Sequence, residues 1–141
     1  MIKIIRNPHW FFLALVPIVF LSGLLNRDAT IPFNISATYI VVDIWSISVF
    51  SVVFFFLIFI NYYALHAIKK PAKRILTIIH IFLQVIALIP LFYIFFTADM
   101  KRDYAQTVDM NIIFVLGFVV FIVASFVHLI NFFVSLLSKK Q

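Results

Sequence analysis

Two histidines are the residues of this chain best suited to chemistry. His80 lies about six residues after the start of one long apolar stretch, and His128 about ten residues before the end of another. If the stretches are adjacent antiparallel helices, the depths of the two imidazoles differ by roughly 6 Å. Such a pair could ligate a b-type haem or relay protons. Gln84 and Asn131 follow one turn later and offer local hydrogen-bond partners, so a purely structural role is the third interpretation.

Asp43 is the one acidic residue within or near an apolar stretch, since the chain has five Asp and no Glu. An ionisable residue at membrane depth suggests a proton or cation contact, whereas an interfacial Asp simply reaches water or a neighbouring loop. The absence of cysteine excludes disulfides, thiolate metal sites and cysteine nucleophiles. No Walker loop, Gly-rich dinucleotide turn, HExxH or GxSxG motif occurs. The sequence therefore predicts no catalytic residue and no metal site.

The elements that must position these residues are apolar helices. The chain has 141 residues, of which 65% are hydrophobic and 11% charged, against roughly 25% charge in an ordinary soluble domain. Lys, Arg, Asp and Glu are missing from four stretches: 7–26, 44–68, 75–98 and 110–138. Each stretch is long enough for a membrane-spanning helix, which needs about 20 residues. We predict an all-α fold, a single transmembrane domain over 1–141 with four spans at about 8–25, 38–67, 75–97 and 110–137.

The basic residues set the orientation of these spans. Eight of the eleven lie at the N-terminus, in the 69–74 connection and at the C-terminus, and three lie in the other two loops. The positive-inside rule then places both termini in the cytoplasm, with the bacterial inner membrane as the expected location. Because the net charge of +6 flanks the spans, it indicates contact with lipid headgroups, and no nucleic-acid partner is predicted.

Two short segments resemble a known family. The segment 35–46 resembles a signature of the haem-copper oxidase catalytic subunit, subunit I, which reads roughly His-Asp-Thr-Tyr-Tyr-Val-Val-Ala-His-Phe-His. Four positions match: Thr38, Tyr39, Val41 and Val42. The segment Met100-Lys101-Arg102-Asp103-Tyr104, with Asp109 beyond it, resembles the family's Met-Pro-Arg-Arg-Tyr followed by Pro-Asp. The number, order and orientation of the spans resemble the last four helices of that subunit.

The departures from the family pattern concern the haem site. Ile44 and Ser46 stand where the family has its haem-ligating histidines, and Ser36-Ala37 replaces the His-Asp pair near the haem propionates. Of the arginine pair that faces the propionates, Arg102 matches, and Asp103 occupies the second position. The resemblance thus implies a helical scaffold that lacks the haem ligands, and it excludes oxygen reduction by this chain alone.

The leading functional prediction is a non-catalytic accessory or structural subunit that packs against a larger membrane complex, for which a respiratory oxidase is one candidate. The residues expected to contact the partner at the outer face are Tyr39, Asp43, Trp45 and Arg102. No cofactor is expected in this case. Two alternatives stay open. One is an electron-transfer protein that holds haem b, or works with a quinone, through His80 and His128. The other is a small transporter.

Overall fold

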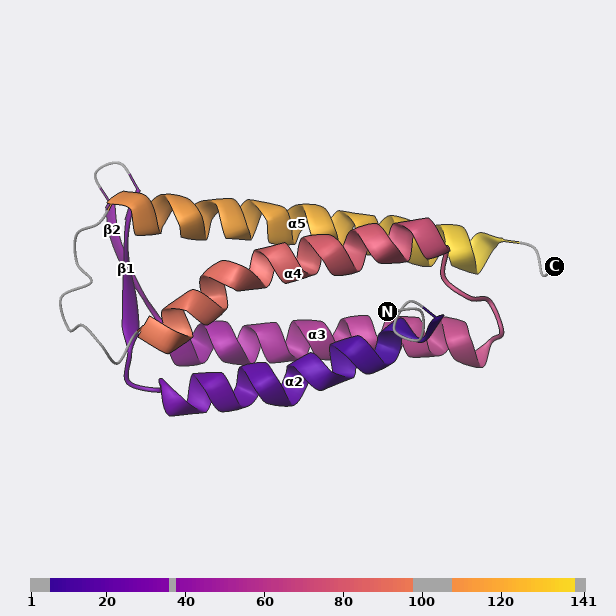
Figure 1. Ribbon diagram of the computed structural model, residues 1–141, viewed down its shortest axis with the longest axis horizontal. Coiled ribbons are helices and arrows are strands. Elements are labelled where there is room, and N and C mark those ends of the chain that lie inside the picture. Colours follow the sequence, from indigo (N-terminus) through magenta and orange to yellow (C-terminus); the bar gives the residue numbers. More distant parts are fainter. Residues whose placement is uncertain (1–5, 36–37, 98–107, 139–141) are drawn as a thin grey trace.

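Four long helices that alternate in direction make up most of the molecule (Figure 1). The computed structural model describes residues 6–35, 38–97 and 108–138. The elements are α2 (Pro8–Leu25), β1 (Thr30–Ile35), β2 (Thr38–Asp43), α3 (Ile44–Ala67), α4 (Arg74–Thr97) and α5 (Val108–Leu137). All four helices are long and apolar enough to span a membrane, which confirms the expectation of four such helices.

The helix bounds follow local sequence signals. Pro8 occupies the first turn of α2, where its missing N–H costs no hydrogen bond. At the C-terminal end of α3, the backbone N–H of Lys70 donates to the carbonyl of Leu65, and the backbone N–H of Lys69 donates to the carbonyl of His66. These bonds form a Schellman motif, which requires a left-handed residue after the helix. Lys69 takes that conformation, with φ 56°.

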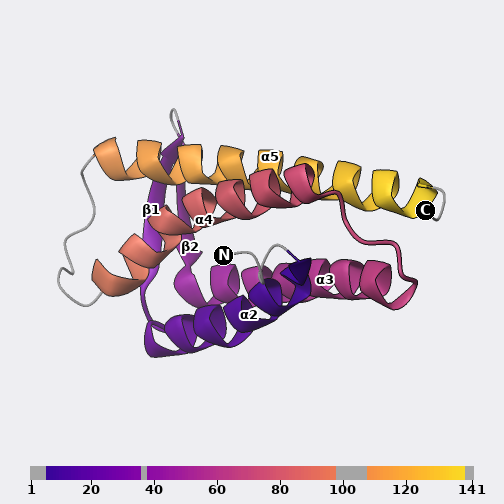
Figure 2. The same cartoon turned by 45° about the vertical axis from the view of Figure 1, so that its right-hand side comes forward.

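The prediction that 38–67 forms one helical span is wrong over its first six residues, and a two-stranded hairpin is added to the predicted helical fold. Residues 38–43 form strand β2, which pairs antiparallel with β1 from Thr30↔Asp43 to Ile35↔Thr38. The segment is rich in β-branched and aromatic residues, which favour strands. Both views show the hairpin crossing one end of the bundle, from the start of α3 toward the start of α5 (Figures 1 and 2). We refer to this end as the hairpin end and to the opposite one as the basic end.

The bundle consists of two closely packed helix pairs. α2 packs along α3 and α4 along α5, whereas the two pairs meet over fewer residues. Small residues permit the close approaches. A Cβ at Gly23 would overlap the side chain of Ser48 on α3, and a Cβ at Gly117 on α5 would lie 2.7 Å from Cγ of Pro90 on α4. The shared core contains Phe12, Leu15, Val19, Ile44, Phe55, Ile58, Tyr62, Leu88 and Leu91.

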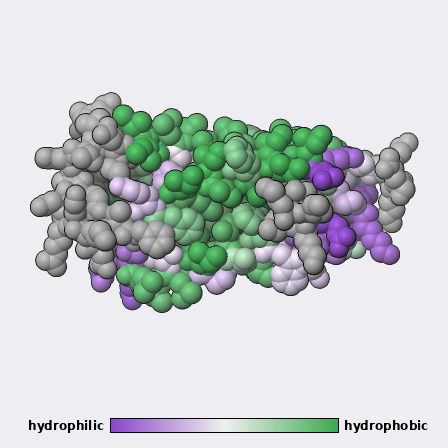
Figure 3. Space-filling model, in the orientation of Figure 1, coloured by the Kyte–Doolittle hydropathy of each residue, from purple (hydrophilic) through white to green (hydrophobic). Residues whose placement is uncertain are grey.

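The outer surface of the bundle is apolar along most of its length. Figure 3 shows a hydrophobic band over the middle of the visible face, with hydrophilic residues toward the two ends, the basic end among them. Large side chains such as Phe50, Phe82 and Phe126 are more than half exposed. In water such a surface would drive aggregation. It is the surface expected of helices that contact lipid.

Candidate functional site

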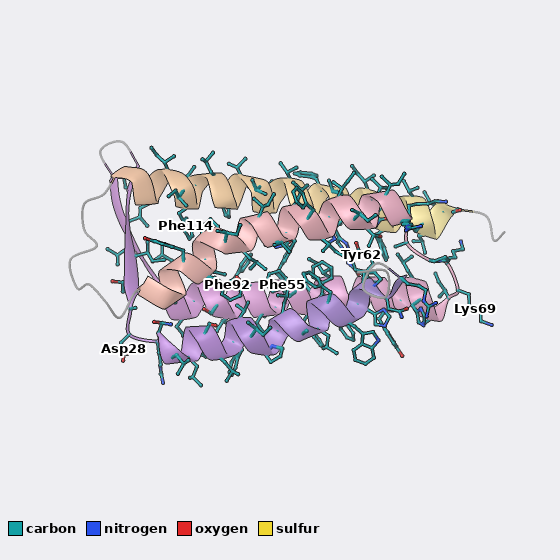
Figure 4. All side chains as sticks on the ribbon, viewed as in Figure 1. Asp28, Phe55, Tyr62, Lys69, Phe92 and Phe114 are labelled. Atoms are coloured by element: carbon teal, nitrogen blue, oxygen red, sulfur yellow. The ribbon has the colours of Figure 1, made fainter. Side chains whose placement is uncertain are left out.

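The two predicted histidines lie together in the interior. His80 on α4 is fully buried, and His128 on α5 is 4% exposed. Their ring centroids are 4.9 Å apart, and the rings are inclined by 32°. The predicted proximity of the two imidazoles is therefore confirmed. They sit in the half of the bundle nearer the basic end, where Figure 4 also places Tyr62.

Each histidine is bonded to α3. The hydroxyl of Tyr62 lies 2.9 Å from Nδ1 of His80, and the amide nitrogen of Asn61 lies 3.2 Å from Nε2 of His128. Because an amide NH₂ group can only donate, Nε2 of His128 accepts, and the proton of the neutral ring is then on Nδ1. The sequence pointed to the local Gln84 and Asn131 as partners. The actual partners come from another helix.

Asn131 on α5 makes further hydrogen bonds next to the two histidines. Its amide nitrogen donates to Thr77 Oγ1 at 3.0 Å and to the Tyr62 hydroxyl oxygen at 3.4 Å. Its carbonyl oxygen accepts the backbone N–H of Lys73 at 3.0 Å. Since the Tyr62 oxygen accepts from Asn131, its own proton is available for Nδ1 of His80, and the His80 proton is then on Nε2. Hydrogen bonds thus join α3, α4 and α5 at this place. We use the name polar cluster for the polar residues gathered here, which are Asn61, Tyr62, Thr77, His80, Gln84, His128 and Asn131.

Four atoms in the polar cluster have no hydrogen-bond partner: Nε2 of His80, Nδ1 of His128, and both amide atoms of Gln84. Gln84 is fully buried, one turn along α4 from His80. A buried polar group without a partner costs roughly 1–3 kcal/mol. By the tautomers inferred above, the two histidine nitrogens are donors. The cluster therefore offers two N–H donors and an amide to a water or a small polar group.

The arrangement of the rings does not suit a haem held between them. Axial imidazoles approach iron from opposite faces of the porphyrin, each through one ring nitrogen. The rings of His80 and His128 are tilted by 32° and their centroids are only 4.9 Å apart, which leaves no room for a porphyrin plane. One nitrogen of each ring is also used in a bond to α3. In the part of the chain that the structure describes, no group of three or more potential ligands surrounds a metal position.

Three of the four predicted partner-contact residues, Tyr39, Asp43 and Trp45, lie far from the polar cluster, at the hairpin end. Asp43 is the N-cap of α3, where its carboxylate accepts the Ser46 N–H at 2.6 Å. This bond holds the pKa of Asp43 below its usual value. Trp45 is half-buried in the first turn of α3 and contacts the ring of Phe20 on α2. The backbone of Tyr39 pairs with Asn34 in the hairpin, and Arg102 lies outside the described residues.

An apolar groove opens between the two helix pairs toward the hairpin end. Its volume is about 330 Å³. Bulky side chains line it, among them Phe50, Phe55, Leu91 and Phe118, together with the small residues Ser46, Ser51, Ala87 and Gly117. Small residues let a foreign helix or chain approach the backbone closely. The groove and the polar cluster occupy opposite halves of the bundle.

Sequence reasoning missed Asn61, Tyr62 and Thr77 as members of the polar cluster, although one signal was present. The polar residues Thr77, His80 and Gln84 on α4 are spaced by three and four, and so are His128, Asn131 and Ser135 on α5. This spacing places each set on one helical face. Two such faces in otherwise apolar helices predict a shared polar interface.

No family model, curated protein or solved structure matches this chain. The fold and the site therefore define its class, a helical protein whose described residues include four helices long and apolar enough to span a membrane. A buried polar cluster joins these helices toward the basic end, and an apolar groove lies between them toward the hairpin end.

Proposed function

We propose that this chain is an integral protein of a bacterial inner membrane with both termini in the cytoplasm, and that it acts without catalysis as an accessory subunit of a larger membrane complex. The exposed apolar side chains of all four helices and the concentration of Lys and Arg at one end support the membrane location. The resemblance to haem-copper oxidase subunit I makes a respiratory oxidase the first partner to test.

The observation that carries this proposal is the apolar groove. It lies between the two helix pairs and presents Ser46, Ser51 and Gly117 among aromatic side chains. Transmembrane helices associate through such small-residue surfaces, because lipid tails alone supply no hydrophobic driving force for helix association. The bonds of the polar cluster, in turn, hold the subunit's own helices together. The groove is thus where a partner's apolar segment binds.

Site-specific photo-crosslinking tests this proposal. A photoreactive phenylalanine at position 118, which is 55% exposed and lines the groove, is compared with one at position 126. Phe126 lies on the same helix, is 61% exposed and does not line the groove. We expect a discrete protein adduct from position 118 in native membranes, identified by mass spectrometry, and only lipid adducts from position 126. Lipid adducts alone from both positions would contradict the proposal.

A second candidate is a quinone-linked electron-transfer protein, and the four unpaired atoms of the polar cluster favour it. The N–H groups of His80 and His128 could donate to a quinone carbonyl. Protein purified from native membranes is examined by mass spectrometry of extracted lipids. A stoichiometric quinone that is lost on replacement of His80 by Phe would support this candidate. A quinone-free protein would exclude it.

A further inference from the structure

A second pocket, of about 270 Å³, opens at the basic end of the bundle. Its charged and titratable lining comes from three helices and the residue before the first N-cap. Arg6 lies just before α2 and His9 in its first turn, Tyr62 and His66 lie near the end of α3, and Arg74 is the first residue of α4. Residues far apart in the sequence thus converge on one small volume, which we call the basic pocket.

No acidic side chain is among the residues that line the basic pocket. All five acids of the sequence are Asp residues at positions 28, 43, 99, 103 and 109, and none occurs in the segments that line the pocket. Figure 4 shows Asp28 at the end of the bundle opposite Lys69. Two guanidinium groups therefore border the pocket with no acidic side chain in its lining. This local excess of positive charge attracts an anion.

Two helix N-termini at the basic pocket also favour an anion. α2 begins at Pro8 and α4 at Arg74, and both residues line the basic pocket. Neither helix has an acidic residue in its first turn, and the side chain of Asn7 makes no cap bond to α2. The free N–H groups and the partial positive charge of such a terminus favour an anion. The helix ends and the arginines thus select the same sign of charge.

His9 is an independent indication of a ligand. Its side chain is only 5% exposed and lines the basic pocket. Its ring centroid lies 5.2 Å from that of His66, so two imidazoles border the same space. A buried imidazole is expected to use its N–H group. Here the pocket is where a partner for that group would lie.

We propose that the basic pocket binds the phosphate group of an anionic phospholipid. Phosphate matches the forked N–H groups of arginine, and its remaining oxygens can accept from His9, His66 and the helix termini. A lipid is favoured over free phosphate because the pocket lies where apolar helices of membrane-spanning length begin and end, the depth of headgroups. Basic pockets between helices at the cytoplasmic surface bind such headgroups. The site depends on the membrane location proposed above, but it requires no protein partner.

Competition between two lipids in native mass spectrometry tests the site. The detergent-purified protein receives equal amounts of phosphatidylglycerol and phosphatidylcholine, which differ in headgroup charge. We expect the wild type to retain phosphatidylglycerol preferentially. Each of Arg6→Gln and Arg74→Gln should lower that preference about fivefold, corresponding to roughly 1 kcal/mol per basic residue near an anionic surface. Both side chains are exposed, so the variants should fold.

Arg27→Gln is the matched control, because it removes the same charge from an exposed residue at the hairpin end. It should keep the wild-type preference, and His9→Phe should lower it while retaining an aromatic ring. Equal retention of both lipids by the wild type, or an equal loss in Arg27→Gln, would overturn the proposal. A third arm adds inorganic phosphate alone. Complete displacement of phosphatidylglycerol by phosphate would also overturn it, since the pocket would then be a site for the free ion.

Discussion

At the scale of single residues, the bond between Tyr62 and His80 is the central link of the polar cluster. It joins α3 to α4 over 2.9 Å inside the bundle. A double-mutant cycle with Tyr62→Phe and His80→Phe should give a coupling energy of about 0.6 kcal/mol, and at most roughly 1.7 kcal/mol, the range for such bonds in membrane proteins. The measurement is reversible unfolding of the four proteins in detergent.

The control for this cycle pairs Tyr62→Phe with Ser125→Ala. The Ser125 hydroxyl donates to the carbonyl of Phe121 in its own helix, so it shares no partner with Tyr62. Its coupling should be zero within error. A cycle in which the Ser125 pair couples as strongly as the His80 pair would show that the effect is general loosening of the bundle.

Lys69 is a residue whose backbone conformation conflicts with its type. Its φ of 56° lies in the left-handed region, which costs a residue with a Cβ about 1–2 kcal/mol relative to glycine. We therefore expect Lys69→Gly to raise the free energy of unfolding by about 1 kcal/mol, because the Schellman motif that ends α3 favours glycine here. Lys69→Ala removes the charge but keeps the Cβ. If both variants were stabilised equally, the effect would come from the removed charge and not from the backbone conformation.

Sequence reasoning reached the histidines but not their partners, for a physical reason. His80 and His128 could be placed at similar depths because rise per residue is fixed in a helix. Which helix faces their ring nitrogens depends on helix rotation, and apolar residues surround every span on all sides, so hydropathy does not fix it. In the sequence Tyr62 is one of several aromatic residues near the end of an apolar stretch, whereas in the structure it is 2% exposed and bonds to His80.

At the scale of elements, the hairpin shows where hydropathy fails. Residues 38–42 are mostly apolar and run directly into the apolar α3, so a hydropathy profile extends the helix backward through them. Hydrogen bonds to the backbone decide where the strand ends and the helix begins. β1 supplies hydrogen-bond partners from Thr30 to Ile35, and Asp43 starts the helix by capping it. An Asp directly before the apolar run that begins at Ile44 was the available sign of a helix start.

Asp43 makes the start of α3 sensitive to acid. Its pKa is held below the ordinary value of 3.8, chiefly because the carboxylate accepts the Ser46 N–H. A lowered pKa in the folded state means that the carboxylate stabilises the fold above the ordinary pKa and that this contribution disappears as the pH falls through the folded value. Asp43→Asn keeps an acceptor oxygen but does not titrate.

Thermal unfolding measured between pH 7 and about pH 3 tests whether this stabilisation is lost at low pH. The difference in midpoint between wild type and Asp43→Asn should be constant at neutral pH and should shrink below about pH 4. Asp28→Asn, which removes another acid at the same end, is the control. The difference in midpoint between wild type and Asp28→Asn should not shrink at low pH, because Asp28 is not the N-cap. A difference that grows toward low pH would contradict the capping role.

At the scale of the whole molecule, polarity divides the bundle along its length. The polar cluster and the basic pocket occupy the half that carries Lys69 and Arg74, and the apolar groove occupies the half next to the hairpin. The helix pairs are thus joined by hydrogen bonds at one end and left apart at the other. This division explains how a chain with so few polar residues can hold its own helices together and still leave an apolar groove open between the helix pairs.

The same division predicts the orientation of the chain, and the lack of native cysteine makes the test simple. Lys69→Cys places a single thiol at the basic end, and Arg27→Cys places one at the hairpin end, and both side chains are exposed. With both termini cytoplasmic, a membrane-impermeant maleimide should label Arg27→Cys in intact cells and Lys69→Cys only in inside-out vesicles. The excess of Lys and Arg at the basic end favours this insertion. The reverse labelling pattern would contradict the orientation, and labelling of both thiols in intact cells would contradict a four-span insertion altogether.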